Sequence, residues 1–202
     1  MKRISILLLI LLLTSLCLTA GKLKIVCSYP YQADLVQKIG KDRVQVSTLA
    51  KGSRDPHFIS PKPSHVAKMR QADLLIINGG QLEIGWIPPL IRQSNNPKVR
   101  PQSSGFLSLF DNIMAIEKPE QVSRAQGDIH PDGNPHFHLD PHNVLIISDA
   151  IADKLSALDP KNRDFYRSNR DAFKQAFEKK LEEWTQAMAA KKGIEIVQYH
   201  KL

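Results

Sequence analysis

The sequence predicts an α/β fold: an N-terminal lobe with a parallel four-stranded sheet flanked by helices, followed by a long helix. Apolar strands alternate with helical stretches along the first half of the chain, which favours a parallel sheet. Residues 73–78 form an apolar strand with polar ends, as in strands buried on both faces. Residues 160–190 carry a continuous helical pattern, and residues 194–199 are interpreted as the first strand of a second α/β lobe whose remainder is missing.

The individual elements follow from periodicity and from helix and turn signals. A helix is indicated by Val144, Ile147, Ile151 and Leu155, which are spaced by three or four residues. The prolines in 82–91 predict a short or kinked helix there. The strands are expected at residues 23–28, 44–49 and 73–78, with a weaker one at 113–116 inside a loop-rich region. The helices are expected at residues 32–39, 63–71, 82–91, 141–157 and 160–190.

The last helix would be roughly 45 Å long at 1.5 Å per residue, more than a compact lobe needs. It is therefore interpreted as a rigid connection between two lobes. The expected organisation is a signal peptide at 1–20, a metal-binding lobe at 21–158, a connecting helix at 159–192 and the start of a truncated C-terminal lobe at 193–202.

Composition excludes several classes of protein. The 202 residues are 42% hydrophobic and 24% charged, which is ordinary for a globular chain. The net charge is +8, but the basic residues are scattered and mostly accompanied by acidic ones along the helices. Nucleic-acid binding requires a clustered basic face, so it is not expected. Two cysteines are too few for a disulfide framework.

The first twenty residues have the layout of a secretory signal peptide. A basic head at 1–3 precedes an aliphatic run, and Ala20 supplies a small residue at the expected cleavage point. Leu16 before Cys17 is bulkier than signals for a lipid-anchored cysteine prefer. The mature chain is expected in the periplasm or on the outer side of the cell membrane. The remaining cysteine, Cys27, lies in an apolar strand and is expected to be a core residue.

Histidines are the chemically distinctive residues. Four of the seven lie within thirteen residues: His130, His136, His138 and His142. Imidazole is the commonest metal ligand near neutral pH, and histidine with carboxylate suits zinc. A polar loop with incidental histidines explains this segment alone equally well.

Two further histidines favour the metal interpretation. His57 follows the strand 44–49, and His200 follows the strand 194–199. In parallel sheets, ligands bind beyond the carboxyl ends of strands, so these side chains could converge with the histidine segment. His65 falls in the helix 63–71 and is expected at the surface, and His142 is expected in the first turn of the following helix.

Five stretches, in order along the mature chain, resemble the solute-binding proteins of ABC importers for zinc and manganese. They are residues 28–36, 55–64, 72–79, 134–143 and 197–200. The resemblance implies two α/β lobes joined by one rigid helix, with the metal ion between the lobes. It implies direct metal ligands at His57, His136 and His200. A histidine at the third position is the choice typical of zinc in that family, and manganese remains the alternative ion.

The chain departs from the family in two respects. The family's second lobe, which carries an acidic fourth ligand, would be absent, so the chain is a fragment, a frameshifted product or a short form. The histidine-rich loop that many members carry is short here. Asp140 is the best local candidate for a carboxylate that orients an imidazole. If its segment is extended, His138 points away from His136 and cannot share the metal.

The predicted function is therefore capture of zinc or manganese by an exported monomer and delivery to an ABC permease in the inner membrane. A truncated metal-binding module, adhesin-like or otherwise without transport, is the alternative. Three histidines and a water also make a catalytic zinc site. However, the chain has neither a His-Glu-x-x-His helix nor a Gly-x-Ser-x-Gly turn, so an enzyme is not expected.

Overall fold

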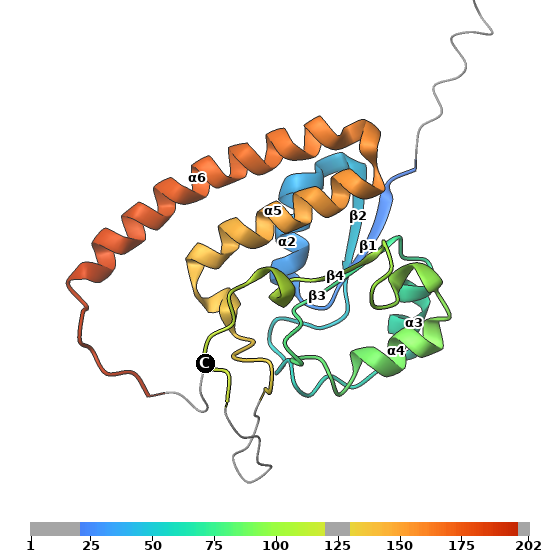
Figure 1. The fold of residues 1–202 in the computed structure, drawn as a ribbon, viewed down its shortest axis with the longest axis horizontal. Coiled ribbons are helices and arrows are strands. Elements are labelled where there is room, and N and C mark those ends of the chain that lie inside the picture. Colours follow the sequence, from blue (N-terminus) through green and yellow to red (C-terminus); the bar gives the residue numbers. More distant parts are fainter. Residues whose placement is uncertain (1–20, 120–129, 198–202) are drawn as a thin grey trace, which may run out of the picture.

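A computed structural model describes residues 21–119 and 130–197. In this part of the chain, four parallel strands form one sheet in the order β2-β1-β3-β4 (Figure 1). The strands are β1 (Leu23–Cys27), β2 (Val44–Thr48), β3 (Leu74–Ile77) and β4 (Phe106–Ser108). The α/β fold class with a four-stranded parallel sheet is confirmed.

The fourth strand is not where the sequence predicted it. Residues 113–116 contain no strand, and β4 lies earlier in the chain, directly after Gly105. Only three residues form β4, and they follow a loop rich in serine and glycine. Such a short apolar run carries no periodicity, so pairing with β3 alone identifies it as a strand.

Five α-helices accompany the sheet in the described ranges. They are α2 (Pro30–Gly40), α3 (Pro63–Arg70), α4 (Ile87–Ser94), α5 (Pro141–Leu158) and α6 (Arg163–Ala189). Helix α4 begins at Ile87, later than the predicted 82–91, because turns occupy the preceding residues. Pro88 and Pro89 then fall in its first turn, where backbone N–H groups have no intrahelical partner and proline is tolerated.

The two faces of the sheet pack against different helices. Ile25 and Cys27 face a core shared with α2, α5 and α6, whereas Val26 faces a core shared with α3 and α4. This alternation is the period of two expected of a strand buried on both faces. Cys27 is fully buried, and its burial raises the pKa of the thiol far above its ordinary value. Cys27 is therefore a core residue, as predicted.

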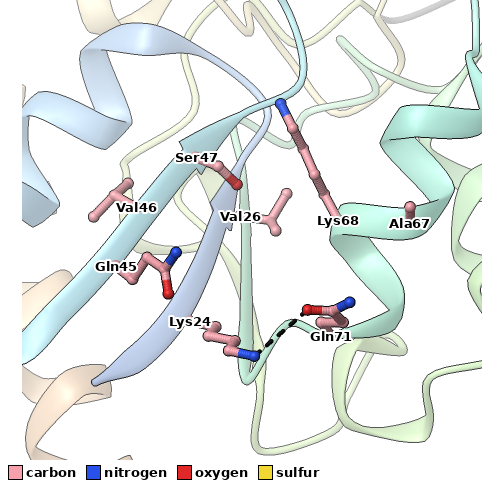
Figure 2. Close-up of a pocket in the computed structure, with 8 residues that line it drawn as sticks. All are labelled: Lys24, Val26, Gln45, Val46, Ser47, Ala67, Lys68 and Gln71. Carbon is pink, nitrogen blue, oxygen red and sulfur yellow. Dashed lines mark hydrogen bonds between the residues drawn. The ribbon is translucent and has the colours of Figure 1, made fainter. Parts of the chain in front are cut away.

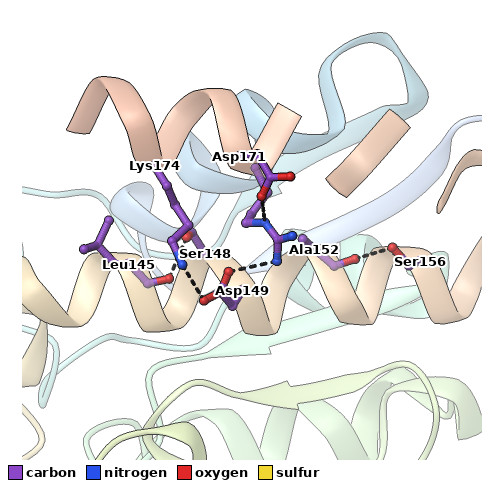
Figure 3. A network of polar contacts seen from close by, with 8 residues as sticks. Leu145, Ser148, Asp149, Ala152, Ser156, Asp171 and Lys174 are labelled. Atoms are coloured by element: carbon purple, nitrogen blue, oxygen red, sulfur yellow. Dashed lines mark hydrogen bonds and ion pairs between the residues drawn. The ribbon is translucent and has the colours of Figure 1, made fainter. Parts of the chain in front are cut away.

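The N-terminal half of α6 is fixed to the lobe. Tyr166 is fully buried, and Asn169 donates a hydrogen bond from Nδ2 to the Ile39 carbonyl at 2.9 Å. Lys174 and Arg170 both form ion pairs with Asp149 of α5, at 2.8 and 2.9 Å (Figure 3). These contacts hold α6 along α5, which itself covers the sheet (Figure 1).

Most of the C-terminal half of α6 and residues 190–197 are exposed. Trp184 and Met188 lie on this half, and Ile196 and Val197 follow it, all exposed to solvent. Residues 194–197 contain no strand, contrary to the prediction for 194–199, whose last two residues lie outside the described ranges. A strand requires a neighbour to pair with, and residues 194–197 pair with no described strand.

Helix α3 covers the sheet only partly near the edge strand β2. A cavity of about 420 Å³ separates α3 from β1 and β2, and Lys24 and Gln71 face each other across it (Figure 2). His65 was expected at the surface, but it is 6% exposed and lies one helical turn before the buried Met69. The apolar residues Val66 and Met69 predicted which face of α3 is turned inward. In the structure, this inward face also includes His65.

No helix in the described ranges is long and apolar enough to cross a membrane. The predicted signal peptide at 1–20 lies outside those ranges.

Candidate metal centre

Three histidines meet beyond the carboxyl ends of the strands. His57 lies in the loop between β2 and α3, and His130 and His136 lie in the segment that leads to α5. Each histidine contributes one ring nitrogen to a group of three atoms that lie within 4.8 Å of one another. The parallel sheet brings these distant segments together at the carboxyl ends of its strands, which is where parallel α/β sheets bind ligands.

His57 is held in a defined orientation by Asp55. Its backbone N–H donates to Asp55 Oδ1 at 2.9 Å, and its Nδ1 lies 2.8 Å from the same oxygen. Because a carboxylate oxygen only accepts hydrogen bonds, this contact places the ring proton on Nδ1 and the lone pair on Nε2. His57 Nε2 lies 3.2 Å from His130 Nε2. A carboxylate that orients a ligating imidazole in this way also raises its basicity toward a metal ion.

The loop that carries His57 is fixed by two side chains from other elements. Trp86 donates a hydrogen bond from Nε1 to the Pro56 carbonyl at 2.9 Å. Tyr29 donates from its hydroxyl to the Arg54 carbonyl at 2.8 Å. These bonds lie on either side of Asp55 and directly before His57, so the loop conformation does not depend on the loop residues alone.

His136 is buried and is positioned through its neighbours. Its backbone N–H donates to Asn134 Oδ1 at 2.9 Å, and the Pro135 carbonyl accepts from Asn78 Nδ2 at 2.8 Å. Asn78 directly follows β3 and accepts a hydrogen bond from the Tyr31 hydroxyl at 2.6 Å. The end of the central strand β3 therefore fixes the segment that carries His136.

Glu83 contacts the residues that follow strands β1 and β3. Its buried carboxylate accepts hydrogen bonds from Ser28 Oγ at 2.6 Å, from Asn78 N–H at 2.7 Å and from Gly79 N–H at 3.1 Å. Burial raises the pKa of Glu83, and these hydrogen bonds oppose the rise. Gly79 has φ +84°, a conformation that favours glycine, so the turn after β3 can bring its N–H to the carboxylate. Sequence reasoning missed Glu83, because it lies in a stretch that was interpreted as an ordinary helix.

The spacing of the cluster fits a tetrahedral ion. At Zn–N distances of 2.0–2.1 Å, two nitrogens of a tetrahedral site lie about 3.4 Å apart. The measured 3.2 Å between the Nε2 atoms of His57 and His130 is close to that value. The ring centroid of His136 lies 5.6 Å from that of His57, so a small movement of one ring would complete a three-nitrogen site.

The structure brings His57 and His136 together, and His200 lies outside the described residues. The third histidine of the described cluster is His130. It was visible in the sequence only as one of four histidines in a short segment, and no spacing rule distinguished it from its neighbours.

Asp140 and His138 are not among the three converging residues, although the ring centroid of His138 lies 6.1 Å from that of His136. Asp140 was expected to orient a ligating imidazole, but it caps α5 and contacts Nδ1 of the exposed His142 at 2.8 Å. The carboxylate that performs this task in the cluster is Asp55. His138 stacks on Tyr31 with 5.0 Å between the ring centroids. Its segment forms a 3₁₀ turn, Phe137–Leu139, so the condition of an extended segment is not met.

Comparisons with known proteins assign the family. The family described as zinc-uptake complex component A, periplasmic (ZnuA), matches residues 25–202. The chain belongs to this family. The metal ABC transporter substrate-binding lipoprotein FimA of Streptococcus parasanguinis is 31% identical over 79% of the chain and 50% of its own length. The manganese ABC transporter substrate-binding lipoprotein PsaA of Streptococcus pneumoniae is 31% identical over 84% of the chain and 52% of its own length.

Solved structures resemble the fold of the same region. A crystal structure of ZnuA shares 29% identity with a TM-score of 0.66, over 84% of this chain and 60% of that one. A manganese-bound periplasmic metal-binding protein from Candidatus Liberibacter asiaticus shares 26% identity with a TM-score of 0.61, over 77% of this chain and 53% of that one. The chain spans about half the length of the curated relatives it matches.

Proposed function

We propose that the protein binds a divalent transition-metal ion, zinc in preference to manganese, outside the cytoplasm for uptake by an ABC importer. The observation that carries the proposal is the convergence of His57, His130 and His136, with two of their nitrogens 3.2 Å apart. Membership of the zinc-uptake family supports the same function.

The donor set favours zinc. Three imidazole nitrogens suit zinc, whereas manganese prefers carboxylate, carbonyl and water oxygens. Asp55 contributes negative charge beside the ion without being required as a ligand, because it contacts Nδ1 of His57. The relatives named for manganese make that ion the competing candidate. His200, predicted as a ligand from the resemblance, remains a proposed additional donor.

Calorimetric titration of the metal-free protein with zinc and with manganese tests this function. We expect one zinc ion per chain and a higher affinity for zinc than for manganese. A higher affinity for manganese would reverse the proposed selectivity, and failure to bind either ion would reject the metal-binding function.

Delivery to a permease needs a separate test. A permease and an ATPase encoded beside the gene would identify the expected partner. With the transporter reconstituted in vesicles and zinc supplied bound to the protein, we expect ATP-dependent zinc uptake. Uptake at the same rate from free zinc without the protein would contradict the delivery role. Export of the chain, predicted from residues 1–20, is tested by the mass of the protein recovered outside the cytoplasm.

A further inference from the structure

A second cavity lies at the N-terminal end of α3, apart from the histidine cluster. Its volume is about 450 Å³, and twelve described residues from the end of β2, the following loop and α3 line it. None of the twelve is acidic, and four are cationic: Lys51, Arg54, Lys62 and Lys68. None of the ligands of the proposed metal site is among them.

Some other basic side chains among the described residues pair with carboxylates. Lys98 pairs with Asp73, and Lys174 pairs with Asp149, each at 2.8 Å. Within the described residues, none of the four cavity cations forms an ion pair. Lys68 donates to the Thr48 carbonyl at 2.8 Å, and both residues line this cavity. Asp55, the acidic residue of the same loop, contacts His57. Positive charge is therefore concentrated here without a matching carboxylate.

Helix α3 adds to the positive potential. Its first residues are Pro63, Ser64 and His65, and the preceding Lys62 provides no side-chain cap. The N-terminus of a helix presents backbone N–H groups and the positive end of the helix dipole, a combination that favours anions. The hydroxyl of Ser64 and that of Ser60 line the same cavity and are additional hydrogen-bond donors.

His65 provides an independent indication of a ligand. The residue is 6% exposed and lines the cavity, and its Nδ1 is buried with no hydrogen-bond partner among the residues that the structure describes. Buried polar side-chain atoms are almost always hydrogen-bonded, and an unpaired one destabilises the fold. A ligand in the cavity would bring a polar group close to this ring.

We propose that this cavity binds a phosphate group, either of inorganic phosphate or of an anionic phospholipid headgroup. A phosphate group offers several acceptor oxygens and at least one negative charge, as a lipid diester or as the inorganic ion, which matches a cavity with several cations and hydroxyl donors. Phe58 and Ile59 also line the cavity, and Phe58 is 72% exposed. An apolar wall of this kind suits the glycerol and acyl portion of a lipid, whereas the cations suit the phosphate from either source.

The test measures binding of inorganic phosphate by calorimetry and co-sedimentation with phosphatidylcholine vesicles with or without phosphatidylglycerol, all with metal-free protein. The site variant is Lys51→Gln with Lys62→Gln. The matched control is Lys179→Gln with Lys191→Gln, which removes the same charge from exposed positions on or after α6. Both substitutions in each variant are at exposed residues, so folding is preserved, and unchanged circular dichroism checks this.

We expect the site variant to weaken binding at least about tenfold and the control to leave it unchanged, because charge-assisted hydrogen bonds are lost only in the former. Binding of inorganic phosphate alone would identify a soluble ligand, and binding of phosphatidylglycerol vesicles alone would identify a headgroup. The proposal is overturned if neither binds or if both variants weaken binding equally. The site variant should bind zinc with unchanged affinity. The phosphate proposal and the metal function can therefore fail separately.

Discussion

Six of the seven histidines lie in the described ranges, and they divide into two groups with different surroundings. His57, His130 and His136 converge at the carboxyl edge of the sheet. His65, His138 and His142 do not join them: one is buried in α3, one stacks on Tyr31, and one is exposed at the start of α5. All six carry the same side chain, so residue type alone does not identify the metal site.

The two groups of histidines differ because their backbone segments are held in different places. His57 and His136 lie on loops fixed by hydrogen bonds from Trp86 and Asn78, so their rings are directed toward a common point. His142 also has a carboxylate partner, Asp140, with the same 2.8 Å contact as His57 and Asp55. A carboxylate partner therefore does not distinguish the two groups, and convergence with other donors is the feature that sets the proposed ligands apart.

The largest expected effect comes from removing a converging imidazole. We expect His57→Ala or His136→Ala to weaken zinc binding by more than about a hundredfold, because loss of a direct ligand should exceed the tenfold to hundredfold cost of losing an orienting partner. His142→Ala should leave the affinity unchanged, since that ring is exposed outside the cluster. Calorimetric titration measures all three. Equal affinities for His57→Ala and His142→Ala would remove the distinction between the two groups.

The two carboxylate–histidine pairs offer a matched comparison. Asp55→Asn replaces an acceptor with an amide that holds the His57 ring less well, and we expect zinc affinity to fall about tenfold to a hundredfold. Asp140→Asn alters the equivalent contact to His142 and should have no effect on zinc. Competition with a chromophoric chelator measures both affinities. A loss in Asp140→Asn comparable to that in Asp55→Asn would show that Asp140 acts on the metal, as the sequence had suggested.

Asn78 is expected to act through the position of His136. Asn78→Ala removes the hydrogen bond to the Pro135 carbonyl and the acceptor for Tyr31, so zinc affinity should fall by about tenfold. Asn169→Ala is the control, because it removes a similar side-chain hydrogen bond to a backbone carbonyl on the far side of the lobe. Both variants should lower the urea midpoint, but only Asn78→Ala should change zinc binding. If zinc affinity is unaffected in Asn78→Ala, the loop of His136 does not depend on β3.

The smallest expected effect is a dependence of stability on pH that arises from histidines outside the cluster. Burial, followed by the nearby Lys68 and Lys62, lowers the pKa of His65, and burial lowers that of His138. Below the ordinary imidazole pKa of about 6.5, the unfolded chain binds protons that these folded rings do not. The metal-free protein should therefore lose stability as the pH falls from about 6.5 toward the lowered values.

Urea unfolding at several pH values measures this dependence. His65→Leu should make it shallower than in the unsubstituted protein. Identical pH dependence in the two proteins would show that His65 takes up its proton as readily in the folded protein as in the unfolded one.

The sequence predicted the features that depend on local patterns. Strands β1, β2 and β3 and helices α2, α3 and α5 lie where periodicity and proline positions placed them, within a few residues. Strand β4 was missed, since three residues carry no periodicity and only pairing with β3 forms the strand. The burial of His65 was also missed, because a single polar residue on the inward face of a helix has no distinguishing signal.

The candidate site was predictable only in part. His57 was recognised because it follows a strand, and His136 because of the family motif around it. His130 and Asp55 were not recognised, because their roles depend on how two separate loops approach each other. The 3.2 Å between the Nε2 atoms of His57 and His130 joins residues 73 positions apart in the chain. No local spacing encodes a contact of that kind.

The central claim is that zinc is bound by His57, His130 and His136 together. Nitrogen NMR of the histidine rings, recorded on metal-free protein during addition of one equivalent of zinc, tests it most directly, with assignments from single histidine variants. We expect the nitrogen chemical shift of one ring nitrogen in each of these three histidines to change as that atom becomes a ligand. The ring nitrogens of His65, His138 and His142 should keep their metal-free chemical shifts. An unshifted His130 accompanied by a shifted His138 would contradict it.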